Sequence, residues 1–445
     1  MAIFEQKTQF SQVLLKVYRV CGEVRPAFSM GAGFSYIGGM IFDEIVKDAY
    51  EEREYPALLA LAHEWSGTRP FRVLRVLVAT PVFRNTLLQY RALIAGGADL
   101  VVGVAGLGSG HEGAGADASN AGAEMPCDPG IVEVLRGTGI PVIGVQEALE
   151  MEAAGCGFDL ILDCAGQFSA CHPRFGFVEL TRSGVQFYEK CEHPVYVADS
   201  GIVKRIETCL GTGEGYVRAL SQLGYDFCLD SGADGLDSGR DDAGKKFVVF
   251  GSGKVGQGIV LQLLRSGADV HVVTDCSRGS CAFLDANGVP VTDCNDLDAV
   301  ASLVRGADFV VTATGVKSAL DRPQIVEALL ASSAVLANMG VEDEYGLGIP
   351  ASRVLAEKKP LNFILEEPTH LKYIDASLAL HAALGEQLLQ EGGAVYGKDG
   401  AGREAVAANK NAGPMDPPSD LEQRILSMTM QDGLIGAEIA EMMGW

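Results

Sequence analysis

One stretch, residues 248–275, constrains the fold of this chain more than any other. It reads VVFGSGKVGQGIVLQLLRSGADVHVVTD: a short apolar run, a glycine-rich turn, an amphipathic segment and a second apolar run that ends on an acid. Gly251, Gly253 and Gly256 form the pattern G-x-G-x-x-G directly after the first run. In this context the pattern predicts a strand, a turn and a helix whose N-terminus holds the pyrophosphate of a dinucleotide.

Each glycine of the motif has its own expected role. Gly251 allows the tight turn, Gly253 lets the pyrophosphate approach the backbone, and Gly256 lets helix and strand pack closely. Lys254 and Val255 lie between them at the start of the helix, so we expect both to contact the cofactor. A glycine turn without a ligand is the structural alternative.

The acid at the end of the second run indicates which dinucleotide binds. Asp275 would accept hydrogen bonds from the adenosine ribose hydroxyls, and a 2′-phosphate in that place would meet a carboxylate. We therefore expect NAD as the cofactor. Arg278, three residues later, leaves NADP as an alternative.

Short apolar runs separated by helix-length stretches recur on both sides of a polar turn region at 230–246. Such alternation predicts an α/β fold with two doubly wound parallel sheets, the second a Rossmann NAD-binding fold, followed by a helical C-terminal extension. The expected strands of the first series are VLRVLVAT (73–80), ADLVVGVAG (98–106), IPVIGVQ (140–146) and FDLILDCAG (158–166). Those of the second are FVVFG, ADVHVVTD, GVPVTD, ADFVVTATG, AVLANMG and NFILEE.

The order of these runs predicts that the chain is divided into three segments. Residues 1–205 form a substrate or catalytic domain, and residues 206–375 form the NAD-binding domain. Residues 376–445 form a helical segment that returns to the first domain, and the stretch 391–420 reads as a mobile linker. The final 26 residues regain helical periodicity, with Asp420 as the expected N-cap.

Charge and cysteine usage restrict the partners and the compartment. The formal net charge of −23 would repel nucleic acid and anionic membranes, so we expect a small-molecule substrate. No run is long enough for a membrane span. Eleven cysteines without a C-x-x-C pair are typical of reduced thiols in a cytoplasm. We expect no metal, although Cys164, Cys171 and His172 leave a zinc site conceivable.

Several fragments, in order, resemble the S-adenosylhomocysteine hydrolase family. The family's VPAINVNDS is similar to HPVYVADSG (193–201), its YGTGQS to LGTGEG (210–215) and its EETTTGV to ELTRSGV (179–185). Its MILDDGG is similar to LILDCAG (160–166), its TTTG to TATG (312–315) and its NIGH to NMGV (338–341).

The resemblance implies a two-domain homo-oligomeric enzyme with tightly held NAD, which transiently oxidises the substrate. It places cofactor contacts at two groups of positions. The first group is Thr181, Arg182 and Ser183. The second, on the nicotinamide side, is Thr312, Thr314, Gly315 and Asn338.

The family's catalytic positions do not carry over. Its histidine in HMTVQTA falls near Pro81, its second strand-end Asp on Cys164, and the second Glu of EETTTGV on Leu180. The histidine of NIGH is replaced by Val341. We therefore expect a rebuilt substrate half on an intact cofactor half.

Other polar residues in the same segments are the candidates for the missing groups. As catalytic residues we expect Glu179, Lys204, Glu207 and His370. A Lys beside a carboxylate can act as an acid or base once its pKa is shifted, whereas a solvated Lys204–Glu207 helical pair is the structural alternative. Arg84 and His111 are the candidates for binding the substrate, Arg84 through a carboxylate or phosphate.

Three functions fit these observations. The first is an NAD-dependent redox enzyme acting on a small polar metabolite other than adenosylhomocysteine. The second is a nucleoside thioether hydrolase with a rearranged site, and the third is an NAD-binding regulatory homologue without turnover.

Overall fold

The computed structural model describes residues 42, 44–106, 127–225, 244–392 and 412–444. They fall into two compact units, each built from two stretches of chain. Unit 1 contains residues up to Lys204 together with Asp375–Leu434, and unit 2 contains Arg205–Ile374 together with Ile435–Trp445.

The described part of unit 1 contains one parallel sheet of seven strands, in the order β12-β6-β5-β4-β1-β2-β3. The order reverses between β1 and β4, so the sheet is doubly wound and the crevice for a ligand is expected at that switch point. The strands are β1 (Arg75–Val78), β2 (Asp99–Gly103), β3 (Val142–Ile143), β4 (Leu160–Asp163), β5 (Gly176–Glu179), β6 (Pro194–Val197) and β12 (Gly413–Met415).

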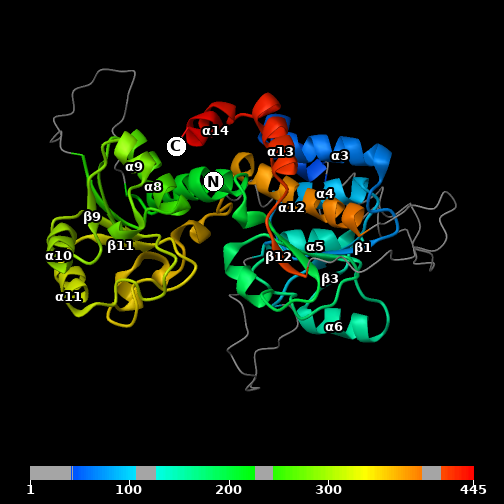
Figure 1. Cartoon of the computed structure of the whole chain (residues 1–445), viewed down its shortest axis with the longest axis horizontal. Coiled ribbons are helices and arrows are strands. Elements are labelled where there is room, and N and C mark those ends of the chain that lie inside the picture. Colours follow the sequence, from blue (N-terminus) through cyan, green and yellow to red (C-terminus); the bar gives the residue numbers. More distant parts are fainter. Residues whose placement is uncertain (1–41, 43, 107–126, 226–243, 393–411, 445) are drawn as a thin grey trace. The chain divides into compact units, whose positions relative to one another are not determined.

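Helices of unit 1 cover this sheet because its apolar runs are buried on both faces. Figure 1 shows α12 beside α4, where the Gln89 amide donates to the Leu378 carbonyl. The helices are α3 (Pro56–Thr68), α4 (Leu87–Ala95), α5 (Pro129–Gly137), α6 (Val145–Ala153), α12 (Leu371–Glu391) and α13 (Ser419–Asp432).

Between residues 244 and 338, unit 2 forms a parallel sheet of five strands in the order β11-β10-β7-β8-β9. This sheet is also doubly wound, and its order reverses between β7 and β10. The strands are β7 (Lys246–Phe250), β8 (Asp269–Thr274), β9 (Val291–Asp293), β10 (Phe309–Thr312) and β11 (Val335–Asn338). The predicted fold class is confirmed in both units.

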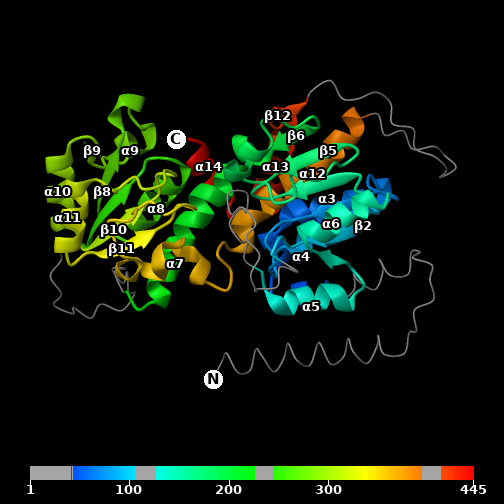
Figure 2. The same cartoon turned by 90° about the horizontal axis from the view of Figure 1, so that it is seen from below.

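The helices of unit 2 pack in pairs. Figure 1 shows α10 and α11 side by side, and Figure 2 shows α7 along α8. Gly213 and Gly258 make the second pairing close, since a Cβ on Gly213 would lie 2.4 Å from the Gly258 carbonyl oxygen. The helices are α7 (Thr212–Gln222), α8 (Lys254–Arg265), α9 (Ala282–Ala286), α10 (Leu297–Arg305), α11 (Pro323–Ala331) and α14 (Gly436–Met443).

The prediction that NFILEE forms a sixth strand of the second sheet is wrong. Residues Leu361–Ile364 form a 3-10 helix that follows Pro360. Pro360 already makes a single bridge with Asn338 at the end of β11, and it has no N–H to extend a ladder. The edge of β11 is therefore covered by a loop instead of a strand.

The C-terminal region also differs from the expectation. Gly413–Met415, inside the stretch expected to be a linker, pairs with β6 as strand β12. Asp420 lies in the first turn of α13, whose N-cap is Pro418. The last segment belongs to unit 2: Ile439 and Met442 are buried, and Arg265 pairs with Glu438 at 3.2 Å.

Across the described residues, each helix is too short or too polar to cross a membrane.

Candidate functional site: the glycine turn of unit 2 and the sheet edge of unit 1

The glycine motif lies between β7 and α8, beside the point where the strand order reverses. Gly251 has φ +108°, and a Cβ on it would lie 2.4 Å from the Ala313 carbonyl oxygen. A Cβ on Gly256 would lie 2.0 Å from the Gly251 carbonyl oxygen. Both positions therefore exclude any larger residue, and the turn is fixed against β10 and α8.

Gly253 differs from its two neighbours. It is the N-cap of α8 with φ −72°, and a Cβ there would meet nothing within 4 Å. The fold itself leaves this position open, at a helix N-terminus where Lys254 and Val255 begin the first turn. This is the geometry that admits a phosphate close to the backbone, because the first amides of a helix lack intrahelical acceptors.

Asp275 follows β8, the neighbour of β7 in the sheet. One oxygen of its carboxylate, Oδ1, accepts hydrogen bonds from the backbone N–H of Ser277 (3.0 Å) and from its hydroxyl (2.6 Å). These bonds fix the orientation of the half-buried carboxyl group at the end of the strand.

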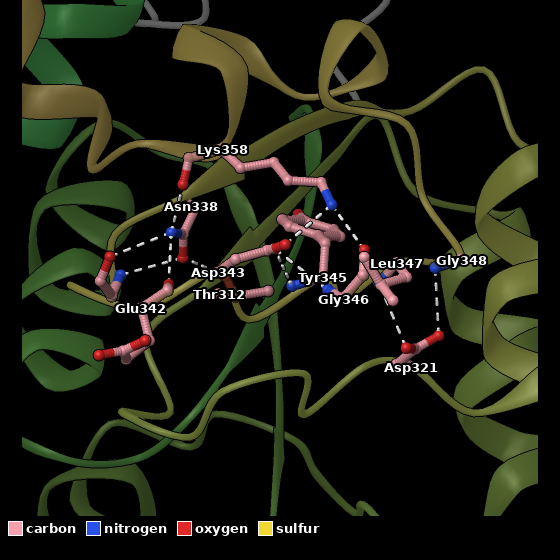
Figure 3. Close-up of polar contacts among 11 residues, drawn as sticks. Thr312, Asp321, Asn338, Glu342, Asp343, Tyr345, Gly346, Leu347, Gly348 and Lys358 are labelled. Atoms are coloured by element: carbon pink, nitrogen blue, oxygen red, sulfur yellow. Dashed lines mark hydrogen bonds and ion pairs between the residues drawn. The ribbon is translucent and has the colours of Figure 1, made fainter. Parts of the chain in front are cut away.

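The expected nicotinamide-side residues lie on the other side of β7, at the ends of β10 and β11. Thr312 and Asn338 are fully buried, and the Thr312 hydroxyl donates to Asn338 Oδ1 at 2.9 Å. Asn338 Nδ2 donates to the carbonyl of Gly340 (3.0 Å). It also donates to the carbonyls of Glu342 (2.9 Å) and Lys358 (2.6 Å), as Figure 3 shows. The Asn338 amide therefore links the loop that contains Gly340 and Glu342 to the segment that contains Lys358.

Thr314 and Gly315 form the turn after β10, and Glu344 holds them. The Glu344 carboxylate accepts from the Thr314 N–H (2.8 Å), the Thr314 hydroxyl (2.7 Å) and the Gly315 N–H (2.7 Å). Burial raises the pKa of Glu344, while these hydrogen bonds oppose the rise. The sequence does not single out Glu344, because in VEDEYG it looks like one of several solvated acids.

In unit 1, Glu179 is fully buried at the end of β5. Its carboxylate accepts from the N–H groups of Ala165 (2.9 Å), Gly166 (2.9 Å) and Thr181 (2.7 Å). The Thr181 hydroxyl adds a bond of 2.6 Å and in turn accepts from the Ser183 hydroxyl at 3.2 Å. Glu179 and Thr181 thus fix the loop after β4.

Asp163, which is not among the residues predicted from the sequence, ends the neighbouring strand β4, directly across from Glu179. It accepts from the N–H groups of Cys164 (2.8 Å) and Phe168 (2.9 Å) and from the Tyr188 hydroxyl (2.5 Å). Burial, and then the charge of Glu179, raise the pKa of Asp163 to about 7. The only signal in the sequence was an acid at the end of an apolar run.

Lys204 is buried in unit 1, with 3% of its surface exposed. Burial lowers the pKa of His381 to about 4, and the positive charge of Lys204 contributes to this shift. His381 Nε2 contacts the Val178 carbonyl at 2.9 Å and its Nδ1 contacts the Gln89 amide nitrogen at 3.0 Å. A neutral ring that donates from Nε2 and accepts at Nδ1 satisfies both contacts.

The other two expected catalytic residues belong to unit 2. Glu207 lies in a π-helical stretch (Ile206–Gly211), where its carbonyl accepts from the Thr212 hydroxyl. His370 directly precedes α12, and its Nδ1 lies 2.8 Å from a Glu214 oxygen. Arg218 pairs with the same carboxylate at 2.8 Å. The His370 side chain is 38% exposed.

The remaining expected residues are placed as follows. Arg84 is half-buried between β1 and α4, and Arg182 is exposed in the short 3-10 turn that follows β5. His111 lies outside the described residues. A small hollow at the ends of β1 and β2 is lined by Thr80, Pro81, Val82, Gly103, Val104, Cys127 and Gln167.

The conceivable zinc site has no counterpart in the parts of the chain that are described. There, three or more His, Cys, Asp or Glu side chains nowhere gather in a way that could hold a metal ion.

Comparison with known proteins identifies the class of the second unit. Residues 241–344 match a family described as "Putative NAD(P)-binding". Among curated protein sequences, none matches the chain significantly. The chain therefore carries an NAD(P)-binding domain, and its cofactor is NAD or NADP.

Three solved structures are similar to parts of the chain. A transhydrogenase from Sinorhizobium meliloti has 16% identity and a TM-score of 0.40, over 71% of this chain and 95% of its own. A dipicolinate synthase from Bacillus halodurans has 14% identity and a TM-score of 0.39, over 71% and 97%. A dipicolinate synthase from Bacillus subtilis has 13% identity and a TM-score of 0.38, over 72% and 98%.

Proposed function

We propose that this protein is an NAD-dependent enzyme that oxidises an alcohol or amine carbon of a small polar metabolite. The observation that carries the proposal is Gly253, which the fold leaves open at the N-terminus of α8 while Gly251 and Gly256 are closed by backbone contacts. A Cβ at Gly253 would enter open space at the N-terminus of α8, where a pyrophosphate would bind. The residues present therefore fit a dinucleotide.

Asp275 supports NAD over NADP. It lies at the end of β8, on the adenosine side of the glycine turn, and Ser277 holds its carboxylate in place. Two ribose hydroxyls can donate to such an anion, whereas a 2′-phosphate would be repelled by it.

We place the substrate at the carboxyl edge of the unit 1 sheet. There the strand order reverses between β1 and β4, and Thr80 and Gln167 are among the residues that line the hollow. Arg84 lies in the segment between β1 and α4, where its guanidinium suits a carboxylate or phosphate of the substrate. Lys204, buried in the same unit, is the proposed charged group of this site.

His370 is the proposed acid and base in unit 2. Bound NAD would supply the hydride acceptor for the carbon that is oxidised, and a base must remove the proton from the hydroxyl or amine. The Glu214 carboxylate beside Nδ1 favours the ring tautomer in which Nε2 is the acceptor. Glu207 and Glu179 are the proposed supporting acids, and in unit 1 Glu179 acts through the loop that it holds.

The resemblance to S-adenosylhomocysteine hydrolase favours a redox cycle, but the replaced positions Cys164, Leu180 and Val341 argue for a different substrate. The hydrolase with a rearranged site and the regulatory NAD-binding protein are the competing functions.

The experiment is to denature the purified protein and identify the released nucleotide by absorbance and mass, before and after incubation with adenosylhomocysteine and a panel of hydroxy and amino acids. We expect NAD to be converted to NADH by one compound of the panel. Conversion only with adenosylhomocysteine would favour the hydrolase. NAD that no compound reduces would favour the regulatory protein, and release of no nucleotide would contradict tight cofactor binding.

A further inference from the structure

We propose that Glu344 is a positioning residue for the nicotinamide half of the cofactor site. The inference rests on the proposed use of NAD. Glu344 is not assigned a contact with the cofactor itself. It holds the Thr314–Gly315 turn, which supports the second nucleoside.

The sheet order fixes which side of the glycine turn each half of a dinucleotide occupies. The turn follows β7, with β8 and Asp275 on one side and β10 on the other. A dinucleotide with its pyrophosphate at Gly253 and its adenosine toward Asp275 therefore extends its second nucleoside over the end of β10. The turn that follows β10 is Thr314–Gly315.

The turn after β10 has an open, exposed position at which a ligand could lie against the backbone. Gly315 is exposed, has φ +69°, and a Cβ on it would meet nothing within 4 Å. The space beside Gly315 is therefore open, as it is beside Gly253, whereas backbone atoms fill the space beside Gly251. Ala313, directly before the turn, lies against Gly251, where a Cβ would be 2.4 Å from the Ala313 carbonyl oxygen.

The Glu344 carboxylate fixes the turn through three donors, the Thr314 N–H, the Thr314 hydroxyl and the Gly315 N–H. The Thr314 hydroxyl oxygen also accepts from the Val316 N–H at 3.1 Å. Glu344 itself is fully buried, and Gly340 provides the space for it, because a Cβ there would lie 2.0 Å from Glu344 Oε1. A larger residue at position 340 would therefore displace the carboxylate.

The residues on both sides of Glu344 anchor it to the rest of unit 2. Figure 3 shows Lys358 Nζ bonded to Asp343 Oδ2 (2.9 Å) and to the Gly346 carbonyl (2.5 Å). The Tyr345 hydroxyl donates to the carbonyls of Val310 (3.0 Å) and Ala337 (3.1 Å), within β10 and β11. These bonds fix the backbone on both sides of Glu344. The Glu344 side chain in turn fixes the Thr314–Gly315 turn through its three hydrogen bonds.

The test compares NAD with ADP, which has the adenosine and the pyrophosphate but lacks the nicotinamide nucleoside. In Glu344→Gln, an NH2 group replaces one acceptor and faces a backbone donor, so the turn loosens. We expect the dissociation constant for NAD to rise about tenfold and that for ADP to stay within about twofold. Glu342→Gln, two residues away with an exposed side chain, is the control and should change neither.

A milder variant, Thr314→Val, removes one donor and should raise the NAD constant several-fold, again without affecting ADP. Unchanged NAD affinity in both variants would overturn the proposal. Equal weakening of NAD and ADP together with a lower melting temperature would overturn it as well, because Glu344 would then only stabilise the fold. If the wild-type protein bound ADP but not NAD, the proposed use of NAD would fail first.

Discussion

At the residue scale, three glycines within six positions meet three different constraints. Gly251 has a left-handed conformation, a Cβ on Gly256 would clash with the Gly251 carbonyl oxygen, and a Cβ on Gly253 would meet nothing within 4 Å. We propose that only Gly253 serves a ligand, because the requirements at Gly251 and Gly256 arise within the fold. The pattern G-x-G-x-x-G does not distinguish them, whereas the structure does.

This difference leads to a paired prediction. Gly253→Ala should fold with a melting temperature close to wild type, since its φ of −72° suits alanine and its Cβ meets open space. It should nevertheless lose NAD affinity by about tenfold or more, because the methyl group occupies the pyrophosphate position. Thermal denaturation and calorimetric titration measure the two effects.

The matched variant is Gly256→Ala, whose Cβ would lie 2.0 Å from the Gly251 carbonyl oxygen. It should lose both stability and NAD affinity. A Gly253→Ala protein that binds NAD as the wild type does would contradict the role assigned to this position.

Asn338 is predicted to stabilise unit 2 by satisfying buried backbone groups. Asn338→Ala would leave the carbonyls of Gly340, Glu342 and Lys358 without their amide donor. We expect the free energy of unfolding to fall on the order of 3 kcal/mol, measured by denaturant titration. Asn295→Ala, at an exposed turn where the side-chain amide donates to Asp293, should cost well under about 1 kcal/mol.

At the element scale, the GTGEG segment explains how α7 contacts its surroundings on two faces. Gly213 faces Gly258 of α8, while Gly211 and Gly215 face the segment that leads to His370. A Cβ on Gly215 would lie 2.6 Å from the Pro368 carbonyl oxygen. The glycines therefore allow α7 to lie close both to α8 and to the residues just before His370. Glu214, which lies on α7, contacts His370.

Gly213→Ala should push α7 away from α8. Its Cβ would lie 2.4 Å from backbone atoms of Gly258, which cannot rotate aside, so we expect a loss of about 2 kcal/mol in unfolding free energy. Gly67→Ala is the control, since Gly67 lies in α3 and a Cβ on it would meet nothing within 4 Å. It should stabilise the protein by up to about 1 kcal/mol. Equal changes in unfolding free energy for the two substitutions would show that helix propensity, and not the packing of α7 on α8, determines the effect at Gly213.

The elements that local patterns specify were predictable, and those that depend on distant residues were not. Apolar runs and the glycine motif indicated the strands and α8, because burial on both faces leaves a continuous signal. Strand β12 exists only through its pairing with β6, and NFILEE looks like a strand although Pro360 prevents it. Likewise Glu344 is a single polar residue whose partner Thr314 lies 30 positions away.

At the scale of the whole molecule, buried acids make stability depend on pH. Burial raises the pKa of Asp375, which accepts from the N–H groups of Ala57 and Leu58, to about 7. Burial also raises the pKa of Glu367 to about 7, and burial and Glu179 do the same for Asp163. Because these folded values exceed the unfolded ones, each contribution is present at low pH and is lost as the pH rises towards about 7.

His381 acts in the opposite direction at lower pH. Burial lowers its pKa from 6.5 to about 4, so its contribution is lost as the pH falls below 6.5. Between about pH 4.5 and 7 these three acids titrate against His381, so we expect the melting temperature to decrease across this range. Asp375→Asn should flatten this decrease, and a melting temperature that rises across the same range would contradict the assignment.

The central claim is that unit 2 binds NAD at the glycine turn with its adenosine ribose at Asp275. The most direct test is a calorimetric titration of the purified, nucleotide-free protein with NAD and with NADP. We predict saturable binding of NAD with a dissociation constant at least about tenfold below that of NADP, because the carboxylate accepts from the ribose diol and repels a phosphate. Equal or tighter binding of NADP, or no binding of either, would contradict the claim.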